Sequence, residues 1–197
     1  MERRGNLISK ESSEFRIIFV EHHSCKRDSP LTNNLKDHAE RLSSGDVEER
    51  LRAAEALCAI GQDASECTIA LIDALADPNE GVREQAIAAL EAIETPAVSD
   101  TSLLAVRLNH PTDDAAYWAT TMLGRIGPSA AKATGPLAAV MANEERAASV
   151  RQRAAWALSK IGPPAADSVP PLQAAAKSAD TRLASLAEKA IAAITNE

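Results

Sequence analysis

Apolar residues recur at helical spacing along most of the chain, and the same pattern returns every 33 to 35 residues. The series comprises four clear copies and a weaker fifth: RLRAAEALCAIG (50–61), REQAIAALEAIE (83–94), AYWATTMLGRIG (116–127), RQRAAWALSKIG (151–162) and ASLAEKAIAAIT (184–195). Each copy has an aliphatic anchor with Ala four residues before it and Ile three residues after it. The anchors are Leu57, Leu90, Leu123, Leu158 and Ile191. These offsets share one face of an α-helix, so each copy is predicted to be an amphipathic helix.

A second helix is predicted before each of these. Its anchors keep nearly the same period: Leu71, Leu104, Leu137 and Leu172. An earlier, atypical helix is expected over 32–44, with His38 in the place of a core leucine. Glycine follows the last Ile of three copies, at Gly61, Gly127 and Gly162, where it would cap a helix C-terminus. The predicted unit is therefore a pair of helices, repeated five times.

This pattern resembles HEAT repeats, in particular the short bacterial form named after phycobilin lyases. The best match is DPNEGVREQAIAALEAI (77–93), with its Asp-Pro turn, its Val-Arg helix start and its Ala/Leu/Ile core. The resemblance implies an all-α fold, a right-handed superhelix (solenoid) of about five HEAT-like helical pairs over residues 31–197. It also implies a structural ladder between the turn Asp and the helix-start Arg, which involves Arg50, Arg83, Arg151 and Asp77.

Residues 1–30 differ in composition from the rest of the chain. They hold both phenylalanines and the only β-like run, FRIIFV, and they end in a polar stretch that is typical of a linker. We expect a polar, poorly ordered tail. His22, His23 and Cys25 lack the fourth ligand and the rigid frame of a metal site.

Composition and charge narrow the function. Aromatic residues are only 3% of the chain and hydrophobic residues 45%, which favours close-packed helices over a β-sandwich or barrel. A net charge of −7 disfavours nucleic-acid binding, which needs a basic surface. Three cysteines without a pairing framework, and no apolar run long enough to span a bilayer, indicate a cytoplasmic protein with no membrane contact. Most of the acidity lies in residues 31–111, with six bases and fifteen acids, whereas residues 112–197 have nine bases and eight acids.

No catalytic pattern is present: the sequence has no Gly-rich phosphate loop, no GxSxG and no HExxH. Its four histidines are not followed by Glu, unlike the repeated His-Glu pairs of the HEAT-like deoxyhypusine hydroxylases. We therefore expect a non-catalytic adaptor or scaffold without a cofactor or metal, which binds a protein or peptide in the concave groove of the solenoid. The alternatives are a phycobilin-lyase-like enzyme or chromophore-binding protein, or a subunit of a larger helical-repeat assembly.

The helical register also predicts which residues face outward. In HEAT arrays the second helices line the concave surface, and positions −9, −5, −2 and +2 from the anchor point away from the core. In the last three copies these outward residues are Asp114, Trp118, Thr121 and Arg125, then Ser149, Arg153, Trp156 and Lys160, then Arg182, Leu186, Lys189 and Ala193.

Tyr117 stands at the edge of this set. The expected binding surface consists of Tyr117, Trp118, Arg125, Arg153, Trp156, Lys160 and Lys189, because exposed aromatics and Arg dominate binding hot spots. Its basic charge suits a partner that carries an acidic residue near an apolar anchor. A slight rotation of each helix would instead tuck the tryptophans between neighbouring helices, and the sequence leaves this alternative open.

Overall fold

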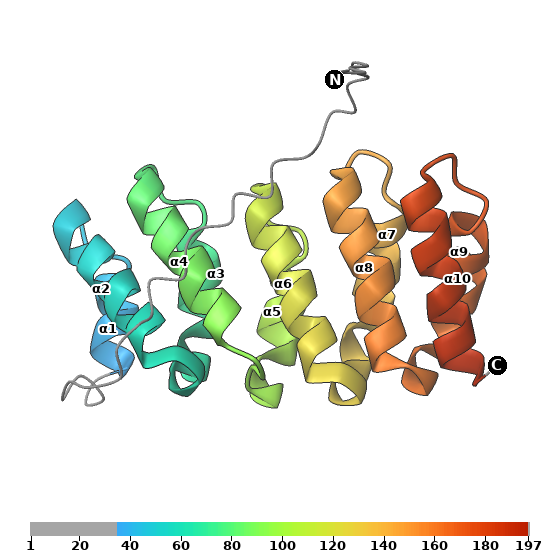
Figure 1. Cartoon of the computed structure of the whole chain (residues 1–197), viewed down its shortest axis with the longest axis horizontal. Coiled ribbons are helices and arrows are strands. Elements are labelled where there is room, and N and C mark those ends of the chain that lie inside the picture. Colours follow the sequence, from blue (N-terminus) through green and yellow to red (C-terminus); the bar gives the residue numbers. More distant parts are fainter. Residues whose placement is uncertain (1–34, 197) are drawn as a thin grey trace, which may run out of the picture.

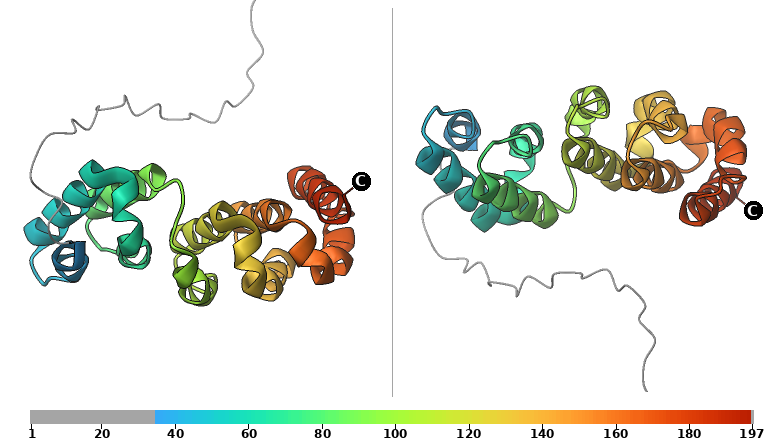
Figure 2. Two further views of the ribbon diagram at one scale, coloured as in Figure 1. Left: turned by 90° about the horizontal axis from the view of Figure 1, so that it is seen from below. Right: turned by 90° about the horizontal axis from the view of Figure 1, so that it is seen from above.

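The computed structural model describes residues 35–196, which form five helical pairs in two layers (Figures 1 and 2). The first helices of the pairs are α1 (Leu35–Arg41), α3 (Thr68–Ala74), α5 (Thr101–Arg107), α7 (Thr134–Ala142) and α9 (Val169–Ala175). The second helices are α2 (Val47–Ile60), α4 (Glu80–Ala92), α6 (Asp113–Ile126), α8 (Ala148–Ile161) and α10 (Thr181–Thr195). Short 3₁₀ helices η1 to η4 lie in the connections: Gly61–Cys67, Val98–Asp100, Gly127–Ala133 and Pro163–Ser168. The predicted all-α solenoid is confirmed, and the described residues contain no strand.

The predicted repeat register sets the core. The first four anchors of the second helices, Leu57, Leu90, Leu123 and Leu158, are fully buried, and so are the anchors of the first helices. The Ala four residues before each anchor is buried in all five copies, which lets neighbouring helices approach closely. Ile191 is only half-buried, because α10 has a neighbouring second helix on one side only within the described residues.

Glycine ends three of the second helices, as predicted. Gly61, Gly127 and Gly162 have φ of 68°, 67° and 69°, a backbone conformation that residues with a Cβ rarely adopt. The N–H of each donates to the carbonyl of that helix's anchor. At each of these three glycines the α-helix ends and the chain turns sharply into a 3₁₀ helix.

Arginines near the starts of the second helices bind the turns between paired helices, either in their own repeat or in the next one. Arg50 donates to both carboxylate oxygens of Asp77 (2.6 and 3.1 Å), which joins the first and second repeats. Asp77 is partly desolvated, which raises its pKa, but hydrogen bonds from Arg50 and the Asn79 N–H outweigh this and hold the pKa below its usual range. Arg83 and Arg151 bind backbone carbonyls instead, so the implied ladder has one Arg–Asp rung within residues 35–196.

The array has a step between its second and third repeats. Helices α2 and α4, α6 and α8, and α8 and α10 pack side by side, whereas α4 and α6 make only sparse contact (Figures 1 and 2). Two polar contacts cross the step: Arg107 pairs with Asp73 at 2.7 Å, and Arg125 donates to backbone carbonyls of the second repeat. We call this region the joint. It divides the second-helix layer, so the expected continuous groove is restricted to α6, α8 and α10.

The predicted tail at 1–30, including FRIIFV and the His22, His23 and Cys25 group, lies outside the described residues. The helix expected over 32–44 is described from Leu35 and ends at Arg41, after which the chain turns. None of the described helices is long and apolar enough to cross a membrane.

Candidate functional site

An aromatic and cationic cluster joins α6 and α8. The Arg153 guanidinium lies over two rings, with its Cζ 4.5 Å from the Tyr117 centroid and 4.9 Å from the Trp156 centroid. Arg153 also donates a hydrogen bond to the Tyr117 hydroxyl. The two cation–π contacts fix the guanidinium in one orientation, so three of the residues predicted for the binding surface form a single unit.

Trp156 reaches from α8 onto the backbone of α6. A Cβ built on Gly124 would lie 2.3 Å from Cζ3 and 2.9 Å from Cε3 of the indole, which shows that the ring rests directly on this glycine. Trp156 is nevertheless only half-buried. Trp156 is therefore both a packing residue and part of the surface.

Trp118 is not on the surface, and its predicted exposure was wrong. It belongs to the core with 8% of its surface exposed. The Arg125 guanidinium covers its ring at 5.6 Å and donates to the carbonyls of Leu90 (2.8 Å) and Ile93 at the end of α4. Because α4 stands apart from α6, the wide joint accommodates the indole. Trp118 and Arg125 thus stabilise the joint. For Trp118 the structure matches the alternative stated above, in which a rotated helix buries its tryptophan between neighbouring helices.

The two predicted lysines are exposed but lie at the margin of the cluster. The Lys160 ammonium is 5.9 Å from the Trp156 ring centroid, a contact at the outer limit of the cation–π range. Lys189 on α10 is exposed and does not line the hollow described next. Both lysines can contribute positive potential to a ligand, but neither is held in a fixed position.

A hollow of about 220 Å³ opens beside the cluster, between α8 and α10. We call it the α8–α10 hollow, and its lining residues are Tyr117, Ser149, Gln152, Arg153, Trp156, Arg182 and Leu186. Arg182 and Leu186 were not among the residues selected from the sequence. They occupy the outward positions −9 and −5 of the last repeat, so the repeat register contained the signal that would have identified them.

The hollow is electrostatically unbalanced. Burial, and then the nearby charge of Arg182, lower the pKa of Arg153 from its usual value. No carboxylate in the described part of the chain lies within 4.0 Å of either guanidinium. The nearby Asp180 carboxylate is already engaged, because it accepts from Gln152 (2.8 Å) and caps the N-terminus of α10. Two arginines therefore share one partly apolar hollow, and no carboxylate of residues 35–196 forms an ion pair with either of them.

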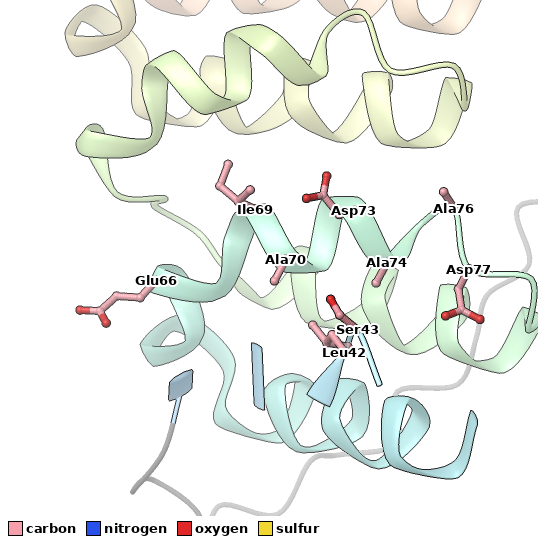
Figure 3. A pocket seen from close by; sticks show the side chains of 9 residues that line it. All are labelled: Leu42, Ser43, Glu66, Ile69, Ala70, Asp73, Ala74, Ala76 and Asp77. Carbon is pink, nitrogen blue, oxygen red and sulfur yellow. The ribbon is translucent and has the colours of Figure 1, made fainter. Parts of the chain in front are cut away.

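A larger hollow of about 440 Å³ lies in the other layer, between α1 and α3 (Figure 3). Two of its three carboxylates are paired, Asp77 with Arg50 and Asp73 with Arg107. In Figure 3 the third, Glu66, points away from the other labelled side chains. This hollow therefore offers no group of polar side chains aimed at one ligand. No group of His, Cys, Asp and Glu within residues 35–196 has the arrangement of a metal site.

Comparisons with known proteins agree with this architecture. A family model described as HEAT repeats matches residues 35–101 and 100–192, two segments that meet near the joint. The chain is similar to a designed armadillo repeat protein in complex with the peptide (KR)4, with 17% identity, a TM-score of 0.58 and 81% of each chain covered. It is also similar to the complex of CpcE and CpcF of phycocyanin lyase from Nostoc sp. PCC7120, with 23% identity, a TM-score of 0.59, and 90% of this chain and 70% of that chain covered.

A third similar structure is an engineered protein, with 22% identity, a TM-score of 0.56, and 82% of this chain and 79% of that chain covered. No curated protein matches the chain. At these identities the structural similarities establish the fold alone.

Proposed function

Because the chain belongs to the HEAT-repeat family, we propose that it is a scaffold that binds a protein or peptide segment on the second-helix surface of α6, α8 and α10. The observation that carries this proposal is the α8–α10 hollow. Half-buried apolar side chains and unneutralised arginines meet there, whereas in the larger hollow beside α3 two of the three carboxylates are already paired with arginines. Trp, Tyr and Arg are the residues that most often dominate the binding energy of protein interfaces.

Charge gives the partner its chemical character. Arg153, Arg182, Lys160 and Lys189 all lie on this surface or at its margin, and the described structure pairs none of them with an acid. The designed armadillo neighbour is described in complex with a basic peptide, (KR)4. The surface of this chain is itself basic, so it suits an acidic segment rather than a basic one. Complementary potentials speed association and exclude like-charged partners.

The proposal includes no catalysis. It rests on the absence of nucleophile, phosphate-loop and metal-ligand motifs from the sequence. A repeat array needs no such groups to function, because stacked repeats present an extended surface on which a partner can bind. The sequence has three cysteines and no disulfide framework, which suggests that the protein works in a reducing cytoplasm.

Selection from a displayed library of random twelve-residue peptides tests the proposal. We expect the full chain to enrich a family of peptides, and the Leu186→Ser variant to lose their binding. Leu103→Ser is the matched control, because Leu103 is an exposed leucine on α5 that does not line the hollow. Circular dichroism of both variants checks that they fold. Failure to enrich any peptide, or equal loss of binding in both leucine variants, would refute binding at this surface.

A further inference from the structure

We infer that the α8–α10 hollow is a carboxylate-binding subsite, in which Arg153 and Arg182 together hold one acidic side chain of the partner. This inference rests on the proposed function and goes beyond it, because it assigns the acidic character of the ligand to one position. It also separates these two arginines from the other cations of the surface. Arg125 is engaged at the joint, and Lys160 and Lys189 lie at the margin of the hollow.

The first support is the state of Arg153. Its guanidinium is partly desolvated and lies over two rings, and Tyr117 is its only hydrogen-bond partner among the described residues. A guanidinium has five N–H donors, so several remain available to a ligand. Because the rings already restrict the side chain, a carboxylate can bind without the entropy loss of ordering a free arginine.

The second support is the position of Arg182. It lies in the first turn of α10, where the helix dipole is positive and a cation is unfavourable. Its charge also lowers the pKa of Arg153, so the two guanidinium groups repel each other across the hollow. A bound anion would relieve both effects. The Asp180 carboxylate at the N-cap of α10 offsets part of the helix dipole, but among the described residues neither it nor any other carboxylate lies within 4.0 Å of the two guanidinium groups.

Size and lining identify the ligand. A hollow of about 220 Å³ is smaller than the roughly 300–1,000 Å³ of most small-molecule sites. Trp156, Leu186 and the Tyr117 ring form apolar walls around the two charges, which suits a carboxylate on a short aliphatic stem. The side chain of Glu or Asp in an otherwise apolar segment has this form. Partial exclusion of water would strengthen each charge-assisted hydrogen bond to it.

The peptides enriched in the library selection provide the first test. We expect Asp or Glu at one fixed position, and replacement of that residue by Asn or Gln should weaken binding about tenfold or more, the usual effect of losing a hydrogen bond to a charged group. Arg182→Gln should weaken binding of the acidic peptide and leave binding of its amide variant unchanged. Lys177→Gln is the matched control, because Lys177 is an exposed cation that lines a different furrow. Enriched peptides that bind equally well with Gln, or that ignore Arg182→Gln, would overturn the subsite while the proposed function stands.

A second measurement does not depend on finding a peptide. The full chain, labelled with ¹⁵N, is titrated with N-acetylglutamate amide and, in parallel, with the neutral N-acetylglutamine amide at millimolar concentration. We expect the carboxylate alone to shift the Nε–H signals of Arg153 and Arg182 and the indole signal of Trp156, and Arg182→Gln to abolish the shifts. Equal shifts with both compounds, or none with either, would overturn the subsite even if the library yields no peptide.

Discussion

Gly124 offers a direct test of how α6 and α8 pack. Replacing a glycine by alanine inside a helix normally stabilises a protein by about 1 kcal/mol, because it restricts the unfolded chain. At Gly124 the new methyl group would lie 2.3 Å from Cζ3 of Trp156, a distance that real Cβ atoms do not tolerate. The indole must therefore move away from α6, together with the Arg153 guanidinium stacked on it.

The expected size of the effect follows from these two opposing contributions. Overpacking of a core costs about 1–3 kcal/mol, and the gain in helix propensity offsets about 1 kcal/mol of this. We expect Gly124→Ala to lower the free energy of unfolding by about 1 kcal/mol, which corresponds to a fall in Tm of about 2–4 °C for a domain of this size. Circular dichroism melts measure the fall, and the displaced ring should shift the Trp156 indole signal in a ¹⁵N spectrum.

Two further variants make this test decisive. Gly135→Ala is the control, because a Cβ at Gly135 on α7 meets nothing within 4 Å, and it should leave Tm unchanged or raise it. In a Trp156→Ala background the obstacle is gone, so Gly124→Ala should become stabilising by about 1 kcal/mol. If Gly124→Ala stabilises the wild-type protein as much as it stabilises the Trp156→Ala protein, the ring does not rest on Gly124 and the described packing is wrong.

Three shorter predictions concern the fold. Leu123→Asp buries an unpaired charge in the middle repeat and should abolish cooperative unfolding in circular dichroism; a wild-type melt would contradict the repeat register. Arg125→Met leaves two α4 carbonyls unpaired, at a cost of about 1–3 kcal/mol, and should speed hydrogen exchange near Leu90 but not in α8. Asp77→Asn should lower Tm at pH 7. Since the pKa of Asp77 is depressed, its stabilisation is present at neutral pH and is lost as the pH falls through that pKa, so the two melts should converge in acid.

The sequence predicts the core of this fold well, because each repeat makes the same contacts with its neighbours. Leu90 and Leu123 are buried for the same reason as Leu57 and Leu158, and one periodic pattern is enough to find them. The same pattern predicts outward positions for Arg153 and Trp156, and both side chains are half-buried and line the α8–α10 hollow. It also placed Arg182 and Leu186 at outward positions of the last repeat, but Lys189 alone was selected from that repeat.

The joint could not be predicted in this way. The anchors on its two sides, Leu90 and Leu123, are 33 residues apart, the same spacing as between Leu57 and Leu90 in the preceding repeats. The spacing of anchors reports how many residues a repeat has, but not how closely its helix approaches the next one. That distance depends on how the side chains between the helices pack, which the spacing of the anchors does not report.

The two tryptophans show how the distance between helices decides the role of an outward side chain. Trp156 faces a helix that approaches closely, because Gly124 has no side chain, so its ring contacts α6 at this glycine and remains half-buried. Trp118 faces the joint, where α4 stands further away, so its ring fits between the helices and is buried. Arg125 then covers Trp118 and binds the end of α4, whereas Arg153 covers Trp156 and keeps donors free. A Trp–Arg pair therefore stabilises the contact between two repeats in the third repeat, and in the fourth repeat it forms a surface that is available to a ligand.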